Sequence, residues 1–161
     1  LCLVISELME AVEADRKGKH ADTKKFNQEM DYYIHEMKLY GENYDKAYRD
    51  TFEYYLKDSV EDELADACIR LLDLAGLRGY DLDKLDYEGS DTVDYSEMDF
   101  TESMYRICVY VTDGFYNEYY DTLLNEIFAF CKDRSIDIFW FINQKMKYNE
   151  LRPYKHGDKS Y

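Results

Sequence analysis

The sequence has very little proline or glycine, with one proline and seven glycines in 161 residues. So few turn-forming residues argue against a glycine-rich sandwich and against a fold dominated by loops. No apolar run approaches the roughly 20 residues that span a bilayer, so we expect a soluble chain. No alternating strand pattern or internal repeat is visible, and we therefore predict an all-α helical bundle in a single domain spanning residues 1–161.

The common nucleotide- and zinc-binding motifs are also missing. The sequence has no GxxxxGK[ST] loop and no GxGxxG fingerprint. Its three histidines, His20, His35 and His156, have no partner three or four residues onward that would complete a helical zinc site. A Cys–His nucleophile pair stays open, although no local sequence supports one.

The four cysteines form no CxxC pair. Three of them lie among apolar residues at helical spacing, which is typical of buried thiols. We interpret them as reduced residues of a cytoplasmic protein rather than as disulfide partners. They are Cys2, Cys68, Cys108 and Cys131.

The chain is strongly acidic, with a formal net charge of −15 from 35 acidic and 20 basic residues. Such a charge repels nucleic-acid backbones and anionic membranes, so we expect neither as a partner. An acidic protein that handles phosphates needs metal cations as intermediaries.

Apolar periodicity and capping residues predict where the helices begin and end. Gly18 provides a left-handed cap, Gly41 divides a tyrosine-rich stretch, and Ser59 caps the clearest helix. Asp99 and Glu102 form a capping box. The predicted helices cover 1–17, two pieces of 22–57, 59–75, a short piece after Asp81, 102–113, 117–133 and 136–150, with Gly114 as a break and an acidic loop at 86–98.

The chain begins at Leu1 within an apolar stretch and has no initiator methionine. A signal-peptide remnant would show a basic flank and a small-residue cleavage site, and neither is present. We expect the chain to begin inside a helix whose upstream part is missing.

Two short acidic motifs carry the clearest chemical information. The first runs from Glu7 to Glu10 and the second from Glu63 to Asp66. Residues i and i+3 share a helix face, so each motif presents two carboxylates beside an apolar stripe. Two such helices packed antiparallel would bring four carboxylates together, and hard oxygen ligands favour Mg²⁺ or Mn²⁺.

A second interpretation of these motifs is a solvated helical face. With 35 acidic residues, pairs at this spacing also arise by chance. Glu10 with Glu13 and Asp58 with Glu61 are two examples. Spacing alone leaves both interpretations open.

The C-terminal segment is basic in an acidic chain. Residues 143–161 contain five Lys or Arg and two acids. Lys145, Asn149 and Arg152 are spaced to share one helix face, which could donate to a polyphosphate. The alternative is that cations favour a helix C-terminus.

Together these segments resemble the MazG-like family of all-α nucleoside triphosphate pyrophosphatases. The family hallmark is an ExxE motif on one helix and an ExxD motif on a later one, which Glu7–Glu10 and Glu63–Asp66 match. The Lys-x-x-x-Asn-x-x-Arg pattern at Lys145, Asn149 and Arg152 is similar to the family's C-terminal signature. The resemblance covers about a quarter of the chain.

The resemblance implies Mg²⁺-dependent cleavage of a nucleoside or deoxynucleoside triphosphate to the monophosphate and pyrophosphate. Mn²⁺ is a possible substitute, and a homodimer or homotetramer is expected. The implied metal ligands are Glu7, Glu10, Glu63 and Asp66, of which Glu7 and Glu10 would also be catalytic. The implied substrate contacts are Lys145, Asn149, Arg152, Tyr154 and Lys155, with Arg16 and Lys19 as weaker candidates.

The sequence departs from compact family members through insertions at about 20–57 and 77–134. A non-catalytic acidic helical interaction protein that has kept the fold is therefore the alternative function. A carboxylate-bridged di-iron bundle would need Glu-x-x-His pairs, and none exists. For Trp140 we favour core packing over base stacking, and for the tyrosines helix packing or a subunit interface.

Overall fold

The computed structural model describes residues 1–40, 43–81, 93–117 and 120–152. These ranges contain helices and no strand, which confirms the all-α prediction. The helices are α1 (Cys2–Arg16), α2 (Thr23–Tyr40), α3 (Tyr44–Tyr55), α4 (Val60–Leu77), α5 (Phe100–Asn117), α6 (Tyr120–Asp133) and α7 (Ile138–Glu150).

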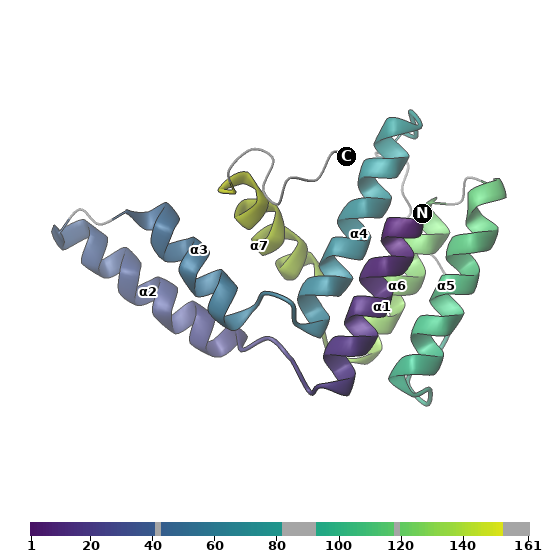
Figure 1. The fold of residues 1–161 in the computed structure, drawn as a ribbon, viewed down its shortest axis with the longest axis horizontal. Helices are drawn as coiled ribbons and strands as arrows, with labels where there is room; N and C mark the ends of the chain where they lie inside the picture. Colours follow the sequence, from purple (N-terminus) through teal and green to yellow (C-terminus); the bar gives the residue numbers. More distant parts are fainter. Residues whose placement is uncertain (41–42, 82–92, 118–119, 153–161) are drawn as a thin grey trace.

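Four of the helices form a bundle. Helix α1 packs against α4 and α5, and α6 packs against the same two helices from the other side (Figure 1). Helices α1 and α4 run antiparallel and make the most extensive contact in the molecule. The two helices that carry the acidic motifs are therefore direct neighbours.

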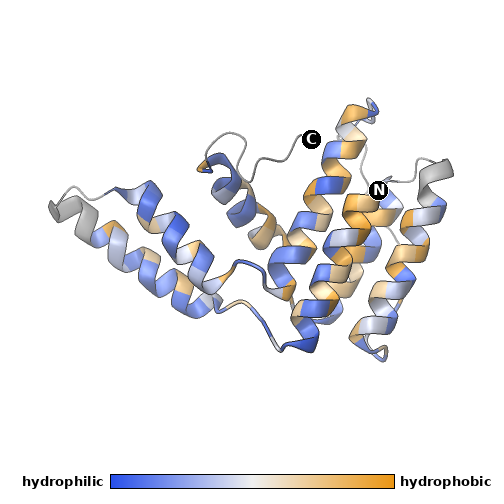
Figure 2. Ribbon diagram, in the orientation of Figure 1, coloured by the Kyte–Doolittle hydropathy of each residue, from blue (hydrophilic) through white to orange (hydrophobic). Residues whose placement is uncertain are grey.

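The core lies between the inward faces of these four helices. Figure 2 shows hydrophobic residues concentrated on α1, α4 and α6, whereas α2 and α3 are mainly hydrophilic. Burying an aliphatic side chain contributes about 1.5–3 kcal/mol, so this shared core holds α1 against α4. Its fully buried members include Leu8, Leu64, Leu71, Met104, Ile107, Leu123, Ile127 and Phe130.

The other three helices extend from the bundle. Helix α7 packs on α4, and both helices of the α2–α3 hairpin contact α7 (Figure 1). Trp140 of α7 makes edge-to-face contacts with Phe26 and Phe141 and is partly buried, as expected for core packing. The tyrosines differ in their exposure to solvent: Tyr48 is buried, whereas Tyr54 is exposed.

The helix caps follow the sequence. Gly18 has a φ of +64°, the left-handed conformation that glycine adopts without a Cβ clash. The Ser59 hydroxyl accepts a hydrogen bond from the Asp62 amide at 3.2 Å, and Asp99 accepts one from Glu102 at 2.7 Å. These three predicted helix ends are confirmed.

Other boundary predictions were less accurate. Helix α5 continues to Asn117, so the predicted break at Gly114 is wrong. A helix tolerates an interior glycine for about 1 kcal/mol, which tertiary packing can offset. The short helix predicted after Asp81 and most of the 86–98 loop lie outside the described residues.

All four cysteines are free thiols; Cys68 and Cys131 are buried, Cys108 is half-buried and Cys2 is exposed. Among the described residues, no helix combines the length and apolar character needed to cross a membrane.

Candidate functional site

The segment that links α1 to the rest of the chain sets the register between α1 and α4. The Lys19 carbonyl accepts a hydrogen bond from the Val60 amide at 3.1 Å. The Ala21 amide donates to the Glu61 carboxylate at 2.9 Å, and the Lys19 ammonium lies 3.4 Å from Asp58. These contacts fasten the end of α1 to the start of α4, so residues one or two turns earlier in α1 face residues one or two turns later in α4.

This register brings three of the four predicted metal ligands together. Glu7, Glu10 and Glu63 each offer a carboxylate oxygen, and the three oxygens lie within 4.8 Å of one another. Glu7 and Glu63 are buried, whereas Glu10 is exposed and accepts a hydrogen bond from the Ser6 hydroxyl at 3.3 Å. We refer to Glu7, Glu10 and Glu63 as the carboxylate trio.

The trio is electrostatically crowded. Burial, and next the charge of Asp62, raise the pKa of Glu63 from 4.5 to about 8. Burial, and next the charge of Asp66, also raise the pKa of Glu7, while a hydrogen bond from Arg70 opposes the rise. Both pKa shifts show that the ionised carboxylates are disfavoured here. A cation bound beside Glu7 and Glu63 would stabilise their ionised forms.

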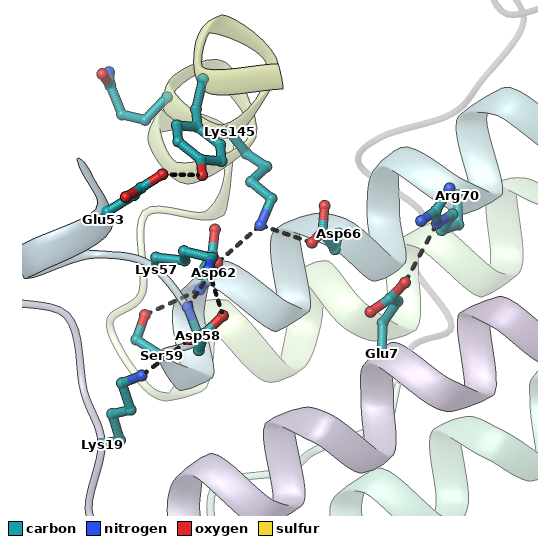
Figure 3. Close-up of polar contacts among 12 residues, drawn as sticks. Glu7, Lys19, Glu53, Lys57, Asp58, Ser59, Asp62, Asp66, Arg70 and Lys145 are labelled. Atoms are coloured by element: carbon teal, nitrogen blue, oxygen red, sulfur yellow. Dashed lines mark hydrogen bonds and ion pairs between the residues drawn. The ribbon is translucent and has the colours of Figure 1, made fainter. Parts of the chain in front are cut away.

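The fourth predicted ligand, Asp66, is engaged elsewhere. Its carboxylate lies 2.7 Å from the ammonium of Lys145, which reaches across from α7 (Figure 3). The same ammonium lies 2.8 Å from Asp62, and both Lys145 and Asp62 are buried. The protein therefore supplies its own cation to Asp66 in this structure.

The side chain of Lys145 keeps its positive charge despite its burial. Burial alone would lower the pKa of Lys145, but the carboxylates of Asp62 and Asp66 raise it well above its usual value. The sequence did not single out Asp62 as a partner. Its position in an acidic first turn of α4 gave no sign of a contact with α7.

Aromatic packing between α3 and α7 positions Lys145. Phe52 stacks on Tyr148 with ring centroids 4.3 Å apart, and the Tyr148 hydroxyl donates to Glu53 at 2.7 Å. The Tyr48 hydroxyl donates to the Gln144 carbonyl at 2.9 Å. Gln144 and Tyr148 lie on either side of Lys145 in the sequence of α7. Their contacts with α3 fix this helix so that Lys145 reaches α4.

Arg70 is a second residue that sequence reasoning missed. It lies one turn beyond Asp66 on α4, and its Nε donates to Glu7 at 3.3 Å (Figure 3). The spacing Asp66 to Arg70 is i to i+4, so the signal was present in the sequence as a cation on the carboxylate face.

A pocket of about 340 Å³ adjoins the trio. Glu10 and Glu63 form its acidic wall, and Lys17 and Lys19 contribute cations. Lys17 pairs with Glu13 at 3.2 Å. An anionic ligand in this pocket would therefore lie near both carboxylates and lysine ammonium groups. Glu13, Ala14 and Asp58 complete the lining.

The structure describes only part of the remaining substrate contacts that were predicted from the sequence. Asn149 is exposed on α7. Arg152 follows the end of α7, half-buried, with its guanidinium 5.5 Å from the Tyr148 ring centre. Tyr154 and Lys155 lie outside the described residues. Arg16 is paired with Glu13 at 3.5 Å.

Comparisons of the chain with protein-family models, with curated proteins and with solved structures found no match. The MazG-like resemblance therefore stays a prediction carried by three short motifs. The geometry of the acidic site is the independent argument for function.

Proposed function

We propose that this chain is a Mg²⁺-dependent nucleoside triphosphate pyrophosphohydrolase, with Mn²⁺ as a substitute ion. The observation that carries the proposal is the carboxylate trio, whose oxygens from two antiparallel helices lie within 4.8 Å of one another. The adjoining pocket of about 340 Å³ has room for part of a nucleotide.

The donor set fits a hard divalent cation. Carboxylate oxygens are the ligands that Mg²⁺ and Mn²⁺ prefer, and the trio has no nitrogen or sulfur donor that would favour zinc or copper. Glu7, Glu10 and Glu63 would hold the ion, and Asp66 would join them on release from Lys145. Asp58, Asp62 and Glu63 form a second group of carboxylates within 4.8 Å, so Glu63 belongs to both groups.

In the proposed reaction, water adds to the α-phosphorus and the bond to the bridging oxygen of the β-phosphate breaks, giving monophosphate and pyrophosphate. A bound divalent cation would supply Lewis acidity and lower the pKa of the attacking water. Glu10 is the exposed member of the trio, so it is the better placed of the two first-motif glutamates to orient that water or accept its proton. Lys17 and Lys19 line the pocket, where they would meet the phosphates.

A non-catalytic interaction protein is the second candidate, and one observation favours it. Lys145 and Arg70 already neutralise Asp66 and Glu7, so part of the acidic cluster is satisfied by the chain itself. A buried, internally paired cluster can be retained for structure alone.

Turnover of a panel of NTPs and dNTPs with Mg²⁺ distinguishes the two candidates. We expect monophosphate and pyrophosphate as products, and Glu10→Ala lowers the turnover rate by roughly 10²-fold or more because the exposed trio member is lost. Chromatography of the nucleotide products provides the measurement.

Glu97→Ala is the matched control, because Glu97 is an exposed acid in the turn before α5. It should turn over substrate like the wild type. Diphosphate and phosphate as products would refute attack at the α-phosphorus. No turnover and no nucleotide binding would favour the interaction protein.

A further inference from the structure

Arg70 occupies a distinctive place beside the carboxylate trio. It follows Glu63 by seven residues and Asp66 by four on α4, so the three side chains share one helix face. The Arg70 side chain is 45% exposed, whereas the Glu7 carboxylate that it contacts is 11% exposed. The partly exposed guanidinium thus contacts a buried member of the trio, as Figure 3 shows for Arg70 and Glu7.

Within residues 1–40, 43–81, 93–117 and 120–152, most of the hydrogen-bonding capacity of this guanidinium is unused. Arginine has five N–H donors in a planar fork. Among the residues that the structure describes, only the Nε of Arg70 has a partner, at 3.3 Å from Glu7 Oε1. The two terminal nitrogens remain available for a ligand in the geometry that matches phosphate oxygens.

The lysines of the region differ from Arg70 in the carboxylates that they contact. Lys145 is buried between Asp62 and Asp66. Lys17 pairs with Glu13 and Lys19 with Asp58. Within the described part of the chain, Arg70 is thus the exposed cation that forms an ion pair with a member of the trio itself.

We propose that Arg70 binds the polyphosphate of the substrate, and that cation binding and anion binding are coupled through the Glu7–Arg70 ion pair. This inference rests on the proposed function. Glu7 accepts the Arg70 hydrogen bond through Oε1, and a divalent cation bound to this carboxylate would reduce the negative charge that it presents to Arg70. A cation bound by Glu7 weakens the ion pair and frees the guanidinium for phosphate, so each ligand favours the other.

The coupling predicts opposite effects of one substitution on two ligands. In Arg70→Ala, Glu7 has no competing internal cation, so Mg²⁺ alone should bind as well as in the wild type or better. Inorganic pyrophosphate in saturating Mg²⁺ should bind at least 10-fold more weakly, because a bidentate phosphate contact is lost. Arg70→Lys should fall between, since a point charge replaces the fork.

Isothermal titration of the full chain with Mg²⁺ alone, and then with inorganic pyrophosphate in saturating Mg²⁺, measures both effects. Arg106→Ala is the matched control, because it removes an exposed arginine from α5. Its affinities should lie within twofold of the wild-type values. The melting temperature of each variant verifies that the fold is intact.

Two results would overturn the inference while leaving the proposed function intact. One is wild-type pyrophosphate affinity in Arg70→Ala. The other is a fall in Mg²⁺ affinity in Arg70→Ala, which would give Arg70 a purely structural role toward Glu7. If the wild-type chain binds neither Mg²⁺ nor pyrophosphate and hydrolyses no nucleotide, the proposed function itself fails.

Discussion

Glu63→Gln should make the metal-free protein more stable and should strongly lower turnover in the presence of Mg²⁺. Glu63 is buried, faces Glu10 and Asp62, and has a pKa raised to about 8. The neutral amide removes this repulsion, so we expect the free energy of unfolding at pH 8 to rise by about 2 kcal/mol without metal. One pKa unit corresponds to about 1.4 kcal/mol, and water in the adjoining pocket screens part of the full shift.

The pH dependence of this gain has a defined sign. Below pH 4.5 the Glu63 carboxyl is protonated in both the folded and the unfolded chain, and its contribution to stability is fully present. As the pH rises, the unfolded chain loses the proton first, and the folded chain keeps it until about pH 8. Stability is therefore lost across this window. The advantage of Glu63→Gln should grow over the same range.

The same substitution should abolish stabilisation by Mg²⁺ and lower turnover by roughly 10²-fold or more, because the trio loses an anionic ligand. Denaturant unfolding at several pH values, with and without Mg²⁺, gives the stability changes. Glu97→Gln serves as the control for removing an exposed negative charge. A Glu63→Gln protein that is less stable without metal, yet still stabilised by Mg²⁺, would contradict this account of the site.

Lys145→Met should destabilise the protein by about 3–5 kcal/mol. The Lys145 ammonium lies 2.8 Å from Asp62 and 2.7 Å from Asp66, and the Asp62 side chain is 2% exposed. Methionine fills much of the same volume but leaves the buried Asp62 charge without a cation. Denaturant unfolding of the full chain near pH 7 measures the loss.

The double variant Lys145→Met with Asp62→Asn is the diagnostic partner. Removing the unpaired charge should restore part of the lost stability, because the main cost is an uncompensated buried carboxylate. Equal stability of the single and double variants would mean that the ion pair does not explain the loss. Lys147→Met changes a neighbouring lysine that contacts Tyr44 at 2.7 Å, and it should cost less because no carboxylate is left unpaired.

Local sequence features predicted the helices because each boundary has a local cause. Gly18 adopts the left-handed conformation that ends α1, and Ser59 supplies the acceptor that begins α4. Gly114 failed as a boundary because one interior glycine costs a helix only about 1 kcal/mol, and α5 continues through it to Asn117.

The acidic site was predictable in part. The i, i+3 spacing places Glu7 with Glu10 and Glu63 with Asp66, and their apolar faces predict that α1 and α4 pack on other helices. The antiparallel direction of α1 on α4 is visible only in the structure. The contacts of Asp62 and Asp66 with Lys145 were not predictable, because they depend on how α7 docks on α4, 83 residues apart in the case of Asp62. Arg70 was also missed, although it follows Asp66 by four residues. Its contact with Glu7 depends on the register between α1 and α4.

In the structure, Lys145 is the counter-ion of Asp62 and Asp66. Its predicted role as a phosphate contact would require it to leave Asp62 and Asp66 or to share its ammonium with the substrate. To bind substrate, Arg70 would likewise have to leave Glu7 or share its guanidinium, but its side chain is already partly exposed. Two of the four predicted ligands, Asp66 and Glu7, thus have a counter-ion from the chain itself.

The most direct test of the account is the position of Mn²⁺ in a crystal of the full chain grown with that ion. An anomalous difference map should show a peak bonded to carboxylate oxygens of Glu7, Glu10 and Glu63. A map without a peak between α1 and α4, at a Mn²⁺ concentration that supports nucleotide turnover, would place the active metal elsewhere and contradict the account.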